Sequence, residues 1–357
     1  MPRLERLEID RFRCHTHLQM ELGECAWVLL EGSNGAGKTS ILEAIFTVLR
    51  GKSFRTRRIL DQIAQGEEEA QVLIWAQSER LHQLGLSLRS TRRLQHVDGK
   101  IGVAVAEIIT SLPTLYLGAK SYELISASPT YRRQFLDWGA FHVEPSFIQI
   151  WRRWRRAHRQ RNRGLRTGVN SPALSPWTVA MAEYGQILTQ FRVRQVERIN
   201  QILSAHEEWR AIFSGGKIQY KQGWEQGSDL LSVLEYIGKR EEKLGQSLAG
   251  PHLDDWVLMV EGKEARNLSR GQQKLAGMWL WRAQCQLLSE AGRAPILLLD
   301  DLVADLDRTA WRQALRALSG VAGQIWVSFL PELGEFPLWE GCKRFHVEPG
   351  KVIMVAC

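Results

Sequence analysis

Residues 29–45, LLEGSNGAGKTSILEAI, leave few folds open to this chain. The apolar run that precedes the glycines, 27–30, predicts a buried strand, and 40–49 predicts the helix that follows. A strand, a glycine-rich loop and a helix in this order predict an α/β nucleotide-binding domain. The loop matches the phosphate-binding pattern G-x-x-x-x-G-K-[ST] at Gly32, Gly37, Lys38 and Thr39.

The loop has a specific physical logic. Its glycines let the backbone turn tightly and point N–H groups inward, where the helix dipole favours phosphate charge. Lys38 is expected to reach the β- and γ-phosphates, and Thr39 to hold Mg²⁺ through its hydroxyl. The alternative is a glycine-rich turn that matches by chance. The residues predicted to contact the nucleotide here are Gly32, Ser33, Asn34, Gly35, Ala36, Gly37, Lys38, Thr39 and Ser40.

A second motif, 295–307, is an apolar strand that ends in two carboxylates, PILLLDDLVADLD. A parallel strand beside the phosphate loop ends where the nucleotide lies, so Asp300 is expected to bind Mg²⁺ directly or through water. Asp301 is the candidate to polarise the attacking water. Lys38, Asp300 and Asp301 are therefore the predicted catalytic residues. The alternative is that adjacent aspartates merely cap a strand or the next helix.

Residues 267–284, NLSRGQQKLAGMWLWRAQ, resemble the ABC-type ATPase signature L-S-x-G-Q at 268–272. At a helix N-terminus, Ser269 and Gly271 can offer a hydroxyl and backbone N–H groups to a γ-phosphate. In ABC-type ATPases that phosphate belongs to the opposite subunit, so the resemblance implies a dimer with ATP between the subunits. Ser269 as an ordinary N-cap, with Gln272 near the third helical position, is compatible with the same structure.

Composition suggests the partners. The 357 residues include 47 Lys and Arg against 39 Asp and Glu, and the net charge of +8 favours a polyanionic partner if it is clustered. The five cysteines are scattered without metal-ligand spacing, so no disulfide framework or zinc site is expected. No apolar run approaches the ~18 residues of a membrane span, and the N-terminus lacks a signal-peptide core. We expect a cytoplasmic protein without a membrane partner.

The chain changes character twice along its length. Long helical stretches start near 129, with a Gly/Ser/Pro break at 168–176, and strand and helix alternate again from about 250. We predict an interrupted α/β head at 1–127 and 246–357, with a helical insert at 128–245. The predicted strands are 4–9, 18–22, 26–30, 70–76, 84–89, 254–262, 294–301 and 323–330, and the later helices are 271–288 and 308–318.

The insert between the two motifs is too long for a transporter ATPase subunit and lacks the coiled-coil heptads of SMC and Rad50 proteins. With several further segments, the sequence resembles the RecF family of bacterial recombinational-repair ATPases over nearly the whole chain. These segments are LEIDRFR at 7–13, GKSFRT at 51–56, YRRQFLDWGAFHVEP at 131–145, GPHLDD at 250–255 and the D-loop-like ADLD at 304–307.

The resemblance implies an ABC-type P-loop ATPase head with a mixed sheet, like that of SMC and Rad50, interrupted by an α-helical second lobe. It implies ATP and Mg²⁺ as cofactors, an ATP-dependent homodimer and weak, DNA-stimulated ATP hydrolysis. It also implies binding to single-stranded, duplex and junction DNA, with RecR and RecO as partners in loading RecA. Beyond the loop and the carboxylates, it places Ser269, Arg270, Gly271, Gln272 and Asp305 at the nucleotide.

Two positions depart from the expected pattern. The family usually has a Pro-Glu-containing segment before the insert, but residues 115–124 read LYLGAKSYEL, so we assign no Q-loop glutamine. Ser328 lies at the switch position where transporters carry histidine. Its hydroxyl could hydrogen-bond a γ-phosphate but would be a poor base at neutral pH, which is consistent with slow turnover.

The candidate DNA-binding segment is 151–166, WRRWRRAHRQRNRGLR, which holds eight arginines and no acid. On a helix, Trp151, Trp154 and His158 form one stripe. Arginines on the other faces can neutralise phosphates, although a solvated face is the alternative. A smaller cluster, formed by Arg55, Arg57 and Arg58, either couples ATP to DNA or is a charged loop. The predicted DNA contacts are Arg152, Arg153, Arg156, Arg163, Arg55 and Arg57.

Other readings fit less well. His252 in GPHLDD could be a catalytic base, but a Gly-Pro turn that opens a strand explains that stretch better. A nuclease-associated ATPase would need Toprim-like or H-x-D-x-x-H residues, and the sequence shows neither. A transporter subunit would need a membrane partner and a short helical subdomain.

Overall fold

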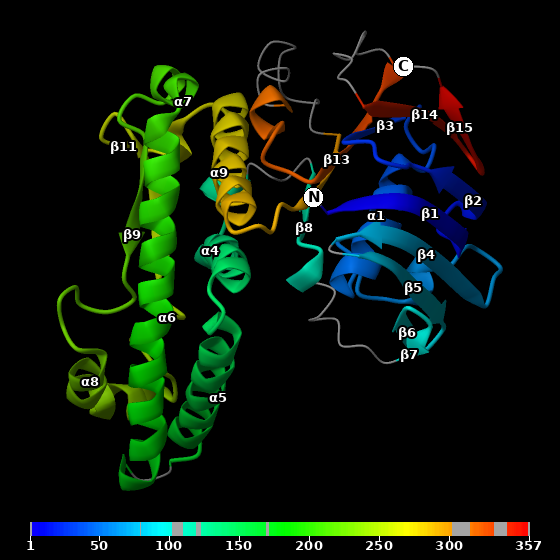
Figure 1. The fold of residues 1–357 in the computed structure, drawn as a ribbon. Helices are drawn as coiled ribbons and strands as arrows, with labels where there is room; N and C mark the ends of the chain where they lie inside the picture. Colours follow the sequence, from blue (N-terminus) through cyan, green and yellow to red (C-terminus); the bar gives the residue numbers. More distant parts are fainter. Residues whose placement is uncertain are drawn as a thin grey trace. The chain divides into compact units, whose positions relative to one another are not determined.

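The structure is a computed structural model that describes residues 2–78, 80–101, 110–118, 123–168, 171–301, 315–331 and 341–355. The chain forms two compact units: the first combines Met1–Ser121 with Leu288–Cys357, and the second is Tyr122–Leu287 (Figure 1). The second unit thus extends beyond the predicted helical insert, 128–245, and includes the signature segment.

The first unit contains a mixed six-stranded sheet in the order β15-β14-β3-β13-β12-β8. Its neighbouring strands run parallel except for β15, which pairs antiparallel with β14. The central strands are buried at every position, which explains their continuous apolar sequences. The strands are β3 (Trp27–Glu31), β8 (Thr114–Leu117), β12 (Ile296–Asp300), β13 (Gln324–Phe329), β14 (Cys342–Glu348) and β15 (Lys351–Val355).

A second, antiparallel sheet in the same unit has the order β2-β1-β4-β5-β6-β7. Helix α1 (Lys38–Arg50) contacts strands of both sheets, and because it is enclosed, all its residues except Thr39 and Arg50 are buried. The 3₁₀ helix η1 (Leu60–Gln62) follows it. The strands are β1 (Arg3–Phe12), β2 (His15–Glu21), β4 (Glu69–Gln77), β5 (Leu81–Arg89), β6 (Arg92–Val97) and β7 (Lys100–Ile101).

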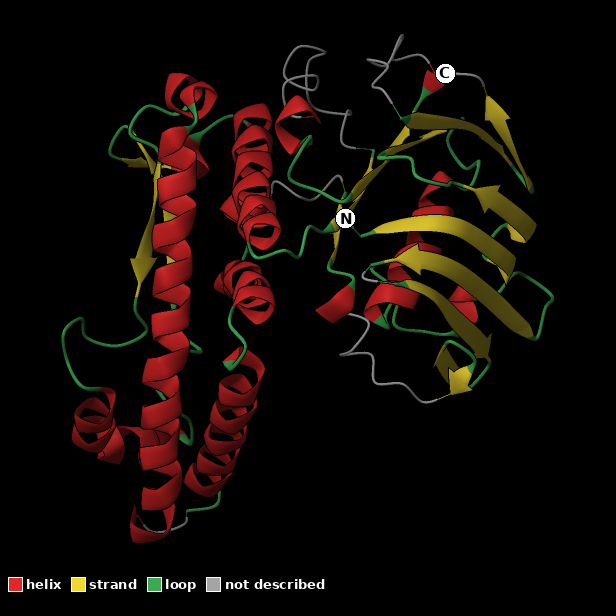
Figure 2. Cartoon of the chain, viewed as in Figure 1, coloured by secondary structure: helices red, strands yellow, loops and turns green. Residues whose placement is uncertain are grey.

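Helices dominate the second unit (Figure 2). Its long helices α5 and α6 pack side by side, and buried Trp154, Ala157, Leu188 and Phe191 belong to the core around them. The helices are α3 (Glu123–Ser126), α4 (Pro129–Val143), α5 (Phe147–Arg166), α6 (Ser171–Ala205), α7 (Glu207–Ile212), α8 (Leu230–Leu244), η2 (Ala265–Asn267) and α9 (Arg270–Glu290), whose last residues enter the first unit.

This unit also has a small antiparallel sheet in the order β11-β10-β9. The strands are β9 (Lys217–Lys221), β10 (Asp255–Val260) and β11 (Lys263–Glu264). The predicted strand at 254–262 is therefore confirmed as β10, but it pairs with β9 and β11 in the sheet of the second unit. Strand β9 was not predicted, because KIQYK is short and mostly polar.

The predicted strands of the first unit are confirmed, and helix 271–288 is confirmed as α9. The predicted break at 168–176 is wrong over much of its length, because α6 already begins at Ser171 and contains Pro176. Pro176 lies in the second turn, where a proline removes one helical hydrogen bond and crowds the preceding turn, yet the helix continues through it. Of the predicted helix 308–318, residues 315–318 are helical and the others lie outside the described residues.

Two predicted absences concern chemistry and membranes. The cysteines within the described ranges, Cys14, Cys25, Cys285 and Cys342, form no disulfide bond with one another. Among the helices of the described residues, we find none with the length and apolar character that crossing a membrane requires.

Candidate nucleotide site

The phosphate loop joins β3 to α1, as its sequence predicts. Gly35 and Gly37 have φ values of 82° and 105°, a backbone conformation that L side chains rarely adopt. A Cβ added to Gly32 would lie 2.3 Å from the carbonyl oxygen of Val347, and one added to Gly37 would lie 2.6 Å from the His15 ring. The loop therefore needs glycine at 32 for close approach and at 37 for both reasons.

Lys38 folds back over this loop. Its Nζ donates to the carbonyl oxygens of Gly32, at 2.5 Å, and Ser33, at 2.8 Å. Burial lowers the pKa of Lys38, while the negative charges of Asp301 and Asp300 act in the opposite direction. The ammonium group is therefore held at the loop by two carbonyl oxygens.

The carboxylate of Asp300 is the centre of the second half of the site. Its Oδ1 accepts hydrogen bonds from the hydroxyls of Thr39, at 3.0 Å, and Ser328, at 2.6 Å. Strands β12 and β13 are parallel and pair Asp300 with Ser328, while Thr39 lies in the first turn of α1. The structure thus brings together three predicted site residues from segments far apart in the sequence.

Asp301 follows immediately and has a different environment. Its side chain is exposed, and its backbone N–H donates to the Ser328 hydroxyl at 3.0 Å. Its φ of 47° lies in the left-handed region, which is uncommon for a residue with a side chain. Ser328 therefore connects the two aspartates, accepting from one backbone and donating to the other carboxylate.

Tyr116 is a site residue that the sequence did not reveal. From β8, its hydroxyl donates to Asp300 Oδ2 at 3.0 Å. Burial and the neighbouring negative charge of Asp300 raise the pKa of Tyr116, so the hydroxyl stays protonated and remains a donor. The residue lies in 115–124, where the sequence offered no glutamine. A tyrosine between two leucines in a buried strand gave no signal beyond core packing.

The donor set fits Mg²⁺. The Thr39 hydroxyl and the Asp300 carboxylate are hard oxygen ligands next to the phosphate loop, and Mg²⁺ commonly takes one or two protein oxygens together with substrate phosphates. Within the described residues, no group of three or more His, Cys, Asp or Glu side chains could hold a metal ion by itself. Thr39 and Asp300 are therefore the residues that would hold Mg²⁺ together with nucleotide phosphates.

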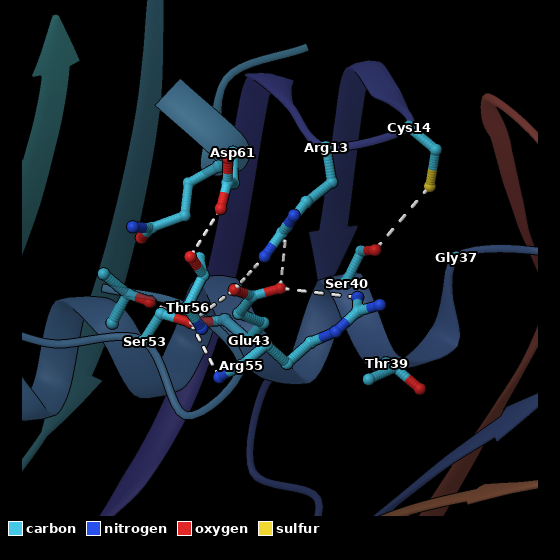
Figure 3. A network of polar contacts seen from close by, with 12 residues as sticks. Arg13, Cys14, Gly37, Thr39, Ser40, Glu43, Ser53, Arg55, Thr56 and Asp61 are labelled. Atoms are coloured by element: carbon cyan, nitrogen blue, oxygen red, sulfur yellow. Dashed lines mark hydrogen bonds and ion pairs between the residues drawn. The ribbon is translucent and has the colours of Figure 1, made fainter. Parts of the chain in front are cut away.

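A polar network is centred on Glu43 of α1 (Figure 3). Glu43 is fully buried, and its carboxylate accepts from Arg13 Nε at 2.9 Å and Nη2 at 2.7 Å. The hydroxyl of Ser53 donates to the same carboxylate at 2.5 Å, and Arg55 lies 3.5 Å from it. Glu43 was not predicted as a site residue, although a lone acid within the apolar helix at 40–49 was a signal.

The signature segment lies in the second unit, at the start of α9. Ser269 accepts from the backbone N–H of Gln272 at 3.3 Å, and the Gln272 side chain accepts from the backbone N–H of Ser269 at 3.1 Å. This reciprocal pair is a capping box, which confirms the N-cap role of Ser269. Arg270 is exposed and Gly271 half-buried in the first turn. The predicted contact at Asp305 lies outside the described residues.

The predicted arrangement of α5 is confirmed. Trp154 is buried and Trp151 and His158 are half-buried, whereas the four arginines assigned to DNA are exposed. Two of the four have guanidinium groups over aromatic rings. The distance from the Arg Cζ to the ring centroid is 5.6 Å for Arg153 over Tyr184 and 5.9 Å for Arg156 over Trp177. The exposed arginines of α5 that are predicted to contact DNA are Arg152, Arg153, Arg156 and Arg163. The predicted contacts from the first unit, Arg55 and Arg57, are also exposed.

His252 has a packing role. Its Nε2 lies 3.1 Å from the carbonyl oxygen of Ser247, and its ring lies 4.3 Å from the ring of His158. The Gly-Pro turn is present, because the backbone N–H groups of Leu253 and Asp254 donate to Gly250 and Pro251. The interpretation of this stretch as a structural turn is confirmed.

Comparisons with known proteins agree with this geometry. The family model described as "RecF/RecN/SMC N terminal domain" matches residues 3–329. The DNA replication and repair protein RecF of Thioalkalivibrio sulfidiphilus is 33% identical over 354 residues, covering 97% of this chain and 98% of the relative.

Solved structures show the fold. A structure of the recombination mediator protein RecF with ATP has a TM-score of 0.84 at 22% identity, covering 99% of this chain and 98% of that one. An SMC head bound to the C-terminal winged-helix domain of ScpA has a TM-score of 0.62 at 17% identity, covering 99% of this chain and 97% of that one. The predicted α/β ATPase-head fold is thus confirmed. With the family model and the full-length relative, this shows that the chain belongs to the RecF family.

Proposed function

We propose that this protein is an ATP-dependent DNA-binding protein of recombinational repair and replication-fork maintenance. ATP drives it to dimerise as a clamp at gapped DNA or single-strand/duplex junctions, and slow hydrolysis resets it. The observation that carries this proposal is the meeting of Lys38, Thr39 and Asp300 around a phosphate loop. The names of the relatives, which are DNA replication and repair proteins, support the DNA part.

Different residues of the site bind the phosphates, hold the metal ion and activate the attacking water. The loop N–H groups and Lys38 bind the phosphates, while Thr39 and Asp300 hold Mg²⁺, which neutralises charge on the β- and γ-phosphates. The exposed carboxylate of Asp301 polarises the attacking water. Ser328 orients both aspartates but, as a hydroxyl, cannot take a proton efficiently at neutral pH. Weak, DNA-stimulated ATPase activity follows, suited to a switch.

DNA binds through clustered arginines. Those on α5 form one surface, and Arg55 and Arg57 form a second one on the head. Guanidinium groups neutralise phosphates independently of base sequence, which suits gaps and junctions better than specific sites.

Assembly completes the function. The exposed N-terminus of α9, with Ser269, Arg270, Gly271 and Gln272, and the D-loop residue Asp305 contact the ATP of the opposite subunit. Ser328 contacts the γ-phosphate in its own subunit. We further propose that the ATPase head comprises 1–127 and 246–357, and that the protein acts in the cytoplasm with RecR and RecO to load RecA.

ATP binding by the loop is tested with Lys38→Met. We expect this variant to lose binding of a fluorescent ATP analogue in an equilibrium titration, because its ammonium no longer meets the phosphates. The matched control is Lys351→Met, which removes an exposed lysine from β15 in the same unit. The two variants having equal affinity for the analogue would refute the site.

A further inference from the structure

A line of contacts leads from the carboxylate of Asp300 to the protein surface. Tyr116 bonds Asp300 through its hydroxyl, and its ring stacks on Phe54 with centroids 3.6 Å apart and planes 14° from parallel. Phe46 of α1 meets both rings edge-on, at 6.2 Å from Tyr116 and 5.4 Å from Phe54. The three rings form one packed group, so a displacement of the Tyr116 hydroxyl also displaces the ring that supports Phe54.

Phe54 belongs to the segment 51–61, which carries its own internal hydrogen bonds (Figure 3). The Ser53 hydroxyl oxygen accepts the backbone N–H groups of Arg55, at 2.9 Å, and Thr56, at 3.1 Å. The Thr56 hydroxyl donates to Asp61 at 2.5 Å. Ser53 attaches the segment to Glu43, and Phe54 attaches it to Tyr116. The segment is therefore a compact loop with one of its attachments ending at the nucleotide site.

The surface of this loop is cationic. Lys52, Arg55, Arg57 and Arg58 are exposed. Arg50 precedes them, and its Nε and Nη1 are buried without a hydrogen-bond partner among the residues that the structure describes. Burial lowers the pKa of Lys52, and the positive charges of Arg50 and Arg57 lower it further. An anionic partner would relieve this mutual repulsion, as a DNA phosphate would.

We propose that Tyr116 is a positioning residue for Asp300 and that the stack of Tyr116 on Phe54 couples the nucleotide site to the basic loop at 51–61. Tyr116 fixes the second oxygen of a carboxylate whose first oxygen Thr39 and Ser328 hold. When nucleotide binding shifts Asp300 or Thr39, the shift reaches the loop through the ring. This coupling rests on the proposed function and names the route by which ATP controls the basic loop.

Limited trypsin cleavage reports directly on the loop, because the protease cuts after Arg55, Arg57 and Arg58 only when the local backbone opens. Cleavage sites are located by mass spectrometry, with and without a slowly hydrolysed ATP analogue and Mg²⁺. Tyr116→Phe removes the hydroxyl and keeps the stack, whereas Phe54→Ala removes the stack and keeps the hydroxyl. Tyr236→Phe is the control, since Tyr236 is a 91% exposed tyrosine of α8 in the other unit.

In the wild-type protein and in Tyr236→Phe, we expect the analogue to change the cleavage rate at the loop. Tyr116→Phe should lose this response and show a kcat for ATP lowered about tenfold with KM little changed, because a hydrogen bond to a charged group that orients Asp300 is lost. Phe54→Ala should be cleaved roughly three- to tenfold faster without nucleotide, because an aromatic contact is lost. It should also lose the response.

Two results would overturn the coupling. The first is a cleavage rate at the loop that does not change with nucleotide in the wild-type protein. The second is a Tyr116→Phe variant whose cleavage response and kcat both equal those of the wild-type protein. Failure of the proposed function is distinguishable from both. If the loop responds to nucleotide but DNA affinity does not, the coupling stands and the DNA-binding proposal fails.

Discussion

Asp300 accepts hydrogen bonds from three hydroxyl groups that come from three elements: Thr39 of α1, Ser328 of β13 and Tyr116 of β8. The donors fix the plane of the carboxylate before any ligand binds. Preorganisation of this kind is what electrostatic catalysis requires, because the site then needs little rearrangement when charge develops. Lys38 is preorganised in the same way, because its ammonium is already held at the loop.

A buried arginine in the second unit allows a test at the same scale. Arg161 of α5 donates to Glu241 of α8 at 2.6 Å, and both side chains are almost fully buried. Arg161→Met leaves the Glu241 charge without this partner, so we expect the free energy of unfolding to fall by about 3–5 kcal/mol. The exposed neighbour variant Arg159→Met should change it by less than about 0.5 kcal/mol. Urea denaturation of both variants is the measurement, and equal stabilities would contradict a structural role for Arg161.

Site residues differed in how far the sequence could reveal them. Lys38, Thr39, Asp300 and Ser328 were predicted, because each follows a recognisable local pattern of strand and loop. Tyr116 was not, because its role depends on contacts with Asp300 and Phe54, which are distant in the sequence. Spacing along a chain indicates where strands end, but not which core side chain reaches across to a neighbouring strand.

Some strands and helices could be predicted from the sequence and others could not. Strands β3, β12 and β13 are continuous apolar runs and were predicted, whereas β6, β7, β8, β14 and β15 are short or only partly buried and were not. Strand β9 is stabilised by pairing with β10, a long-range contact that its own sequence does not encode. The first turns of α6 were not predicted, because the prolines and serines at 171–176 resemble a loop. The helix nevertheless continues through Pro176.

The packing of α5 predicts a pH dependence. Burial, and then the positive charges of His252 and Arg161, lower the pKa of His158 to about 4, while burial also lowers that of His252. Asp254 and Glu241 oppose this at His252, and Arg133 adds to it. Because the unfolded histidine titrates near about 6.5, the unfolded state binds more protons between the two values. The free energy of unfolding should therefore rise from about pH 4 to about pH 6.5 and then level off with respect to this pair.

Urea denaturation at several pH values measures this slope. His158→Gln should reduce the slope, because it removes one of the two groups that must become protonated. The control is His17→Gln, which replaces an exposed histidine of β2 in the other unit. An unchanged slope in His158→Gln would show that other groups govern the acid sensitivity.

At the scale of the whole molecule, the proposed dimer depends on the start of α9. We predict that Ser269→Arg leaves ATP binding intact but prevents ATP-dependent dimerisation, because a bulky cation occupies the surface that meets the opposite γ-phosphate. Sedimentation velocity with and without ATP measures dimerisation. Ser269→Ala is the control for the lost cap, which costs roughly 1 kcal/mol but adds no bulk. Normal dimerisation of Ser269→Arg would rule out the ATP-sandwiched dimer.

Control of DNA binding by ATP at the phosphate loop is the core of the proposed function. Its most direct test is the equilibrium affinity for a labelled gapped DNA, with and without ATP, at two salt concentrations, in the wild-type protein and Lys38→Met. We predict that ATP tightens binding by the wild-type protein alone, and that affinity falls steeply with salt because arginines neutralise phosphates. A wild-type protein that binds ATP while its DNA affinity stays constant would contradict the account.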